Sequence, residues 1–238
     1  MKKLFVLLFV AILFSLNVKA QNTIDSTEIT SSVPELFKFH DVIYVIWHEA
    51  YPSKDIPALK GMVEKIQGDM AKINNAQLPG ILKDKEAKWK DGLKVLNASA
   101  ENYYAAAKGT DDQVMLDAAE KLHADYEFMV RVLRPVSKEV DEYHKDLYVI
   151  FHKFYPAKDY KSIAPMMDVM ISKAEACVNA KLPKRLEGKT EAFQKTAKEL
   201  IEKTVALKET LKSNDGPAID KAVDAMHSKY QDLEKIFE

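Results

Sequence analysis

The side chains of this sequence best suited to chemistry are six histidines, which form two sets of three. Each histidine of the first set is followed 104 residues later by a histidine of the second set. The two sets are His40, His48 and His123, and His144, His152 and His227. A neutral imidazole nitrogen binds transition metals and also haem iron. The two sets therefore predict two equivalent ligand sites.

The histidines belong to an internal repeat. Residues 40–52 read HDVIYVIWHEAYP, and residues 144–156 read HKDLYVIFHKFYP. The offset of 104 residues continues without a gap as far as the His-x-x-Tyr motifs at 123 and 227, with about two dozen identical positions. The repeat predicts two copies of one unit, residues 33–134 and 137–238.

Each unit has the pattern of four helices. Seven glycines in 238 residues are few, which favours long helices joined by short loops. Apolar residues at helical spacing predict the helices of the first unit at residues 34–51, 56–74 and 80–108, and from about 111 onwards. Short loops between such helices favour antiparallel neighbours. We therefore expect an all-α fold of two tandem, up-down-up-down four-helix bundles.

The N-terminus has the pattern of an export signal. A basic start is followed by an apolar run at residues 4–16, and Val18 and Ala20 are suitable for cleavage after Ala20. Residues 1–20 are thus the predicted signal peptide, and the polar residues 21–32 are a predicted disordered leader. The mature protein is expected in the periplasm or outside the cell.

The charge of the mature chain gives no reason to expect nucleic acid or an anionic membrane as a partner. Residues 1–20 contain three lysines and no acid, so 32 basic and 36 acidic side chains remain, a formal charge of −4. A nucleic-acid-binding surface normally requires an excess of basic side chains. We expect no membrane association after signal cleavage, and the sequence leaves the protein partner open.

Helical phase predicts where the histidines point. At 100° per residue, His40 and His144 fall near the centre of the buried stripe of the first helix of each unit, and His48 lies about 80° further round. Antiparallel packing places His40 next to His123. We therefore predict that the rings of His40 and His144 are inaccessible to solvent. His40 and His48 are about 12 Å apart along the helix, so one ion can reach both only from between them.

The predicted ligand set is the six histidines, with one site in each bundle. Imidazoles, with or without a thioether or carboxylate, suit zinc or copper, and b-type haem is the alternative cofactor. A di-iron centre is excluded because the helices do not offer enough inward carboxylates. The accessory ligands predicted beside the histidines are Tyr44, Met62, Glu120, Tyr148, Met166 and Asp224.

The sequence thus favours an exported protein that binds a metal ion or haem, for binding, buffering or electron transfer. The alternative is a non-catalytic structural or protein-interaction module whose histidines only form hydrogen bonds within the core. Catalysis is not supported, because the sequence has no nucleophile–base set and no glycine-rich phosphate loop. The single Cys177 excludes a cysteine-rich metal site.

Overall fold

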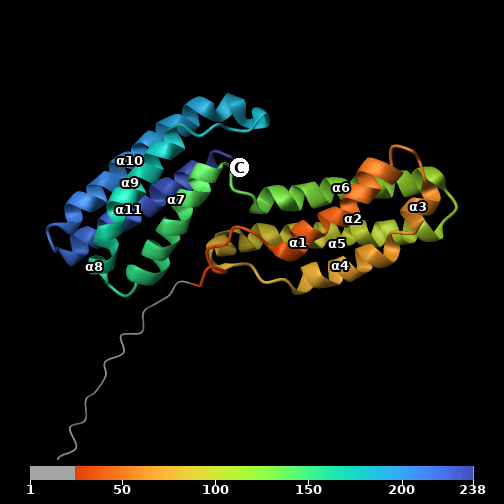
Figure 1. The fold of residues 1–238 in the computed structure, drawn as a ribbon, viewed down its shortest axis with the longest axis horizontal. Helices are drawn as coiled ribbons and strands as arrows, with labels where there is room; N and C mark the ends of the chain where they lie inside the picture. Colours follow the sequence, from red (N-terminus) through yellow and green to blue (C-terminus); the bar gives the residue numbers. More distant parts are fainter. Residues whose placement is uncertain (1–24, 238) are drawn as a thin grey trace, which may run out of the picture.

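The computed structural model describes residues 25–237, and this part of the chain is helical and contains no strand (Figure 1). The all-α expectation is confirmed. The predicted signal peptide, residues 1–20, lies outside the described residues. The elements of the first half, in which η marks 3-10 or π-helical turns, are α1 (Pro34–Lys38), α2 (His40–Tyr44), η1 (Val45–Ala50), α3 (Ile56–Lys60), α4 (Val63–Asn75), η2 (Gly80–Lys85), α5 (Glu86–Lys108) and α6 (Asp112–Leu133).

The second half has a similar series of elements. They are α7 (Lys138–Val149), η3 (Ile150–Phe154), α8 (Tyr160–Ile163), η4 (Ala164–Met166), α9 (Met167–Val178), η5 (Lys184–Lys189), α10 (Thr190–Leu211) and α11 (Gly216–Lys235). One helix, α7, stands in place of α1 and α2, and η4 is an additional 3-10 turn. The helices form two groups that lie end to end, and the chain passes between them from α6 to α7 (Figure 1). Within residues 25–237, no helix is long and apolar enough to cross a bilayer.

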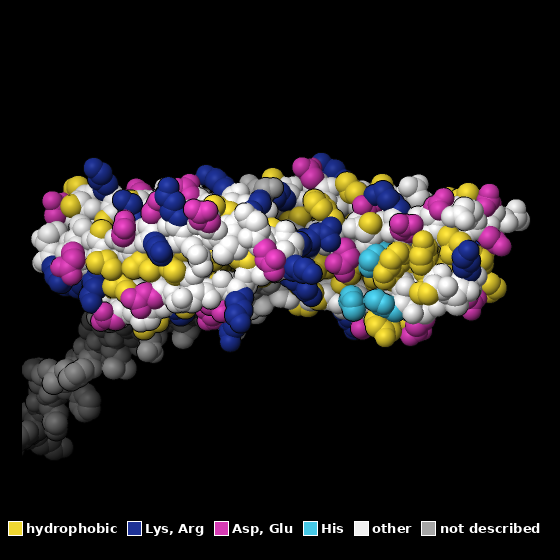
Figure 2. Space-filling view, turned by 90° about the horizontal axis from the view of Figure 1, so that it is seen from above, with side chains coloured by type: hydrophobic (Ala, Val, Ile, Leu, Met, Phe, Trp, Pro, Cys, Tyr) yellow, Lys and Arg dark blue, Asp and Glu magenta, His cyan; other side chains and the backbone are white. Residues whose placement is uncertain are grey.

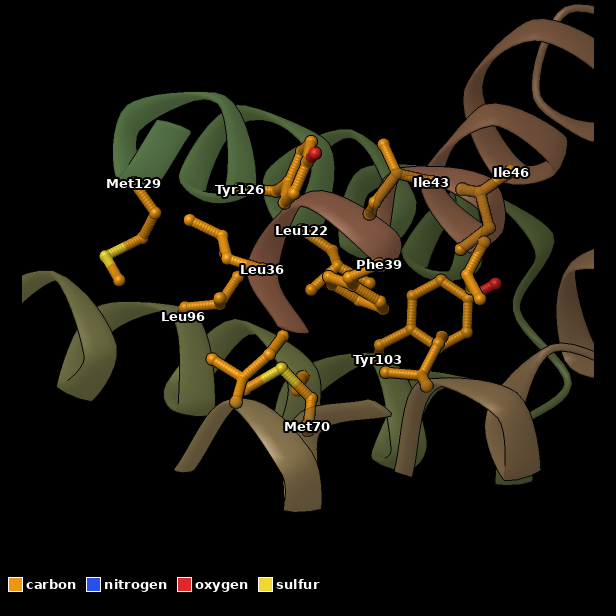
Figure 3. Close-up of a cluster of buried hydrophobic side chains, with 14 of the residues drawn as sticks. Leu36, Phe39, Ile43, Ile46, Met70, Leu96, Tyr103, Leu122, Tyr126 and Met129 are labelled. Atoms are coloured by element: carbon orange, nitrogen blue, oxygen red, sulfur yellow. The ribbon is translucent and has the colours of Figure 1, made fainter. Parts of the chain in front are cut away.

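Each half has its own hydrophobic core. In the first half, Leu36, Phe39, Ile43 and Ile46 are spaced by three and four residues, which places them on one stripe of the first helix. These side chains pack against residues of α4, α5 and α6 (Figure 3). The hydroxyl of Tyr103 donates a hydrogen bond to the carbonyl of Leu59 over 2.7 Å, which satisfies its polar atom inside the core.

The first helix of each half contains a widened, π-helical turn. The amide of Tyr51 donates to the carbonyl of Ile46 over 2.8 Å, and the amide of Tyr155 donates to Ile150 over the same distance. These hydrogen bonds span five residues instead of four. Each residue of such a turn therefore advances by less than the 100° of an ordinary α-helix. Side chains after the turn point in directions that α-helical phase does not predict.

The two halves meet where η2 lies against α7. The side chain of Tyr148, from α7, is only 9% exposed and belongs to the core of the first half. Gly80, at the start of η2, makes this possible, because a Cβ atom there would overlap the Tyr148 hydroxyl. The two halves are therefore joined by a close contact as well as by the linker.

Part of the predicted leader also lies at this junction. The carbonyl of Glu28 accepts a hydrogen bond from the amide of Ile81 over 2.8 Å, and its carboxylate pairs with Lys153 at 3.1 Å. Ser31 donates to the carboxylate of Asp141. The described residues of the leader, 25–32, thus make specific contacts with both halves, which differs from the disorder that their composition predicts.

Replacement of Gly80 with alanine tests the contact between the halves. The added methyl group must displace Tyr148, so we expect a loss of about 1–3 kcal/mol in the free energy of unfolding, measured with urea. Gly188→Ala is the matched control, because Gly188 is also in a 3-10 turn and a Cβ there meets no atom within 4 Å. Equal stability of the two variants would contradict the close contact.

Candidate functional site

The three histidines of the first half lie together on its surface. We call the residues His40, Tyr44, Trp47, His48 and His123 the open face. His40 and His48 are exposed, Trp47 and His123 are half-buried, and Tyr44 is 48% exposed. Histidine side chains gather beside hydrophobic ones on this half of the molecule (Figure 2). An exposed cluster of imidazole and aromatic rings is the most distinctive surface feature of the described chain.

The rings of the open face contact one another, and one pair of them is stacked. Trp47 and His123 are parallel to within 5°, with centroids 4.1 Å apart. Tyr44 lies between His40 and His48, at 6.3 Å and 4.9 Å from their ring centroids. His48 is part of the π-helical turn, whose smaller rotation per residue brings it into line with Tyr44. The widened turn therefore positions the site.

The second half repeats this arrangement with the equivalent residues. Phe151 stands in the place of Trp47 and stacks on His227 at 3.6 Å and 5°. Tyr148 contacts His152 at 4.7 Å, and His144 stacks on Tyr230 at 4.6 Å. We call the residues His144, Tyr148, Phe151, His152 and His227 the covered face. The sequence signal for Trp47 and Phe151 is their aromatic type at the same place in both repeats, which is also typical of core residues.

The segment η2 of the first half covers part of this second face, at Tyr148, and leaves His152 exposed. Asp84 and Lys85 of η2 lie close enough to act on the charges of His152 and His144, respectively. Tyr148 is 9% exposed, whereas the equivalent Tyr44 is 48% exposed. The sequence gives no signal that residues 80–85 belong to a site, because their charged side chains are typical of a solvated surface.

Burial keeps several of these imidazoles neutral. Burial lowers the pKa of His144 to about 3, and the Lys85 ammonium acts in the same direction. Burial also lowers the pKa of His152 and of His227. In the first half, burial lowers the pKa of His123, and the nearby His48 and His40 lower it further. The three histidines of the first half are therefore within electrostatic reach of one another.

The prediction that His40 is inaccessible to solvent is wrong. The buried stripe is centred on Phe39, and in the second half on the equivalent Tyr143. His40 and His144 follow these residues in the sequence and therefore lie about 100° from the centre of the stripe. Tyr143 can occupy the core because its hydroxyl shares a hydrogen bond with Thr204 at 2.9 Å. His144 is half-buried, and His40, which η2 does not cover, is exposed.

The predicted accessory ligands have other partners. The Tyr51 hydroxyl donates to Glu120 over 3.1 Å, and Tyr155 donates in the same way to Asp224. Met62 is buried in the core of the first half, and Met166 packs against the core of the second. Among the six, Tyr44 and Tyr148 lie beside histidine rings, and Asp224 is close enough to His227 to act on its pKa.

The described residues contain no group of three or more histidine, cysteine, aspartate or glutamate side chains placed to hold a metal ion. The rings of each set are neighbours, but they face aromatic rings. A haem between His40 and His123 would have to displace Tyr126 and Trp47, which contact these two rings. The geometry thus favours a site that contacts its ligand through the flat surfaces of these rings.

Comparison of the chain with protein-family models, with curated proteins and with solved structures gives no match. The function is therefore argued from the geometry of the two faces.

The neutral state of His144 makes stability depend on pH. Because the folded pKa is about 3 and the unfolded pKa is near 6.5, the unfolded chain binds the proton more readily between these values. The stabilisation is complete above pH 6.5 and is lost as the pH falls towards 3. We expect His144→Gln to reduce the slope of unfolding free energy against pH, by at most about 1.4 kcal/mol per pH unit.

The measurement is urea unfolding at a series of pH values from 7 to 4. His40→Gln, at the exposed equivalent position, is the matched control and should have a slope closer to that of the unchanged protein. If both variants show the same slope as the unchanged protein, burial of His144 does not control the pH dependence.

Proposed function

We propose that the protein is an exported, non-catalytic binding protein whose open face binds a protein partner. One observation carries this proposal: Tyr148 of the second set is buried where two protein segments meet, whereas the equivalent Tyr44 of the first set is 48% exposed. Interfaces are enriched in aromatic side chains, which bury a large area with few rotatable bonds. An exposed cluster of such rings is typical of a recognition surface.

We also infer that the two halves are tandem antiparallel four-helix bundles, residues 33–134 and 137–238, derived from an internal duplication. Equivalent local features support this inference. Lys54 and Lys158 both have positive φ angles, of 52° and 53°. Asp55 and Asp159 both cap the helix that follows. Shared details of this kind are expected from a common ancestor of the two units.

The covered face illustrates how the open face would bind. Tyr148 is shielded by η2, which approaches it closely at Gly80 and brings Asp84 and Lys85 near His152 and His144. Burial of a tyrosine side chain by such a segment contributes about 1.5–3 kcal/mol. A partner that shields Tyr44 and Trp47 in the same way would gain a similar amount at each ring. Two or three such rings support specific binding.

Site-specific photocrosslinking in the producing cells tests the proposal. A benzoyl-phenylalanine at position 44 should form an adduct with a protein that mass spectrometry can identify. The control places the same group at Val205, an exposed apolar position on α10, and should form no adduct of comparable yield. Equal yields at the two positions, or no adduct at position 44, would contradict a recognition role for the open face.

A second candidate function is binding of a transition-metal ion, as the sequence predicts. The observation that favours it is the proximity of the first three histidines, two of which lower the pKa of the third. A neutral imidazole is the form that binds zinc or copper. His40 and His48 are exposed in the open face, while His144 of the second set is half-buried beside η2. Metal uptake would then occur at one site rather than two, after rotation of the rings.

Titration with Cu²⁺ and with Zn²⁺, followed by calorimetry, tests this candidate. We expect His48→Ala to lower the affinity more than tenfold, because loss of a direct ligand exceeds the effect of losing a supporting residue. His152→Ala is the matched control and should keep the affinity of the unchanged protein. No uptake, or equal loss in both variants, would contradict it. An absorption spectrum with added haem tests the haem alternative, which requires a Soret band.

A further inference from the structure

We infer that the partner of the open face is a second copy of this chain, whose residues 181–189 lie on it. This inference rests on the proposed function and names its partner. The open face and residues 181–189 are on different halves, so each molecule offers both surfaces. Such an association joins unlike surfaces and runs from head to tail.

The first argument is continuity with the contact inside the chain. Residues 80–85, which form η2, cover Tyr148 and lie near His144 of the second set of rings. The segment at the equivalent place in the second half is η5, residues 184–189, and it has the same 3-10 helical form. It is largely exposed within the described structure. The first half thus has a set of rings that no segment within residues 25–237 covers. The second half has a 3-10 segment that covers no such rings in this part of the chain.

The second argument is charge. Residues 181–189 contain four basic side chains and one acidic one. The helices that carry the open face are acidic: residues 34–50 have three acids and one base, and α6 has five acids and two bases. Opposite charges on two surfaces speed their encounter and disfavour wrong partners. A basic segment is the complement that this face requires.

Individual positions show the same change of charge. At the covered face, Lys153 pairs with the acidic Glu28. The equivalent residue of the open face is Glu49, which is exposed. A partner there must bring a cation instead of an acid. Lys184 and Arg185 are exposed, and neither forms an ion pair within residues 25–237.

The contact between copies cannot repeat the internal one atom for atom. Gly80 approaches the Tyr148 hydroxyl closely, and Lys184 stands at the equivalent position in the second half. The segment must therefore lie further from Tyr44 than η2 lies from Tyr148. A lysine side chain fills this added space, because its ammonium can rest over the ring of Tyr44 within reach of Glu49. Tyr44 is 48% exposed and has room to turn towards it.

Sedimentation velocity of the purified mature protein tests the inference. We expect the average sedimentation coefficient to rise with concentration at low salt, and this rise to shrink at high salt. A segment variant, Lys184→Ser with Arg185→Ser, and a face variant, Tyr44→Ser with Glu49→Gln, should each weaken self-association at least tenfold. The control, Lys195→Ser with Lys203→Ser, removes the same charge from exposed positions of α10 and should associate like the unchanged protein.

Mixing the variants gives the sharpest result. The segment variant keeps an intact face and the face variant keeps an intact segment, so an equimolar mixture should form a 1:1 dimer and nothing larger. A mixture that stays monomeric while the unchanged protein associates would overturn the assignment of the two surfaces. A control variant that loses association as fully as the segment variant would overturn it too.

Photocrosslinking from position 44 separates this inference from the proposed function. An adduct of two chains that maps to residues 181–189 supports both. An adduct with a different protein, together with a monomer at all concentrations, overturns the second copy as partner and leaves the proposed function standing. An adduct of two chains that maps to another segment overturns the role of residues 181–189. The absence of any adduct contradicts both.

Discussion

The close approach of Gly80 to Tyr148 is the contact on which the arrangement of the molecule depends. A hydroxyl-bearing ring from the second half is buried in the core of the first, and only a residue without a Cβ leaves room for it. Because Tyr148 is in the same helix as His144, its insertion brings Lys85 of η2 close to the His144 imidazole, while His152 stays exposed. The missing methyl group of Gly80 thus allows Tyr148 to be buried where the two halves meet. No comparable contact covers Tyr44, and the first set stays open to solvent.

The rings themselves are set by the widened turn in the first helix of each half. In an α-helix His48 would lie on the same face as Tyr44, turned by about 40°. The π-helical turn reduces this rotation, and the rings of Tyr44 and His48 lie 4.9 Å apart, beside the stacked Trp47–His123 pair. Such turns weaken a helix and are frequently found at functional sites. Both halves have such a turn at the same place, where it includes His48 in the first half and His152 in the second.

These two features mark the limit of what the sequence can predict. The helical character, the helix breaks and the pairing of equivalent residues follow from apolar spacing and from the constant offset, because these depend on local rules. The direction of the His40 side chain cannot be predicted in this way, because helical phase alone does not decide whether Phe39 or His40 is at the centre of the buried stripe. The covering of His144 depends on a segment some sixty residues away. Neither helical phase nor composition contains that long-range information.

The same residues therefore acquire different chemistry in the two halves. Partial burial holds His144 neutral far below neutral pH, with a pKa of about 3. Exposure leaves His40 and His48 accessible and surrounds them with flat rings and acidic neighbours. Two faces built from equivalent residues thus differ: Tyr148 of one joins the two halves, and Tyr44 of the other is exposed to solvent. A ligand, whether a protein segment or an ion, would then find one open site per chain, because the contact at Gly80 buries Tyr148 of the other.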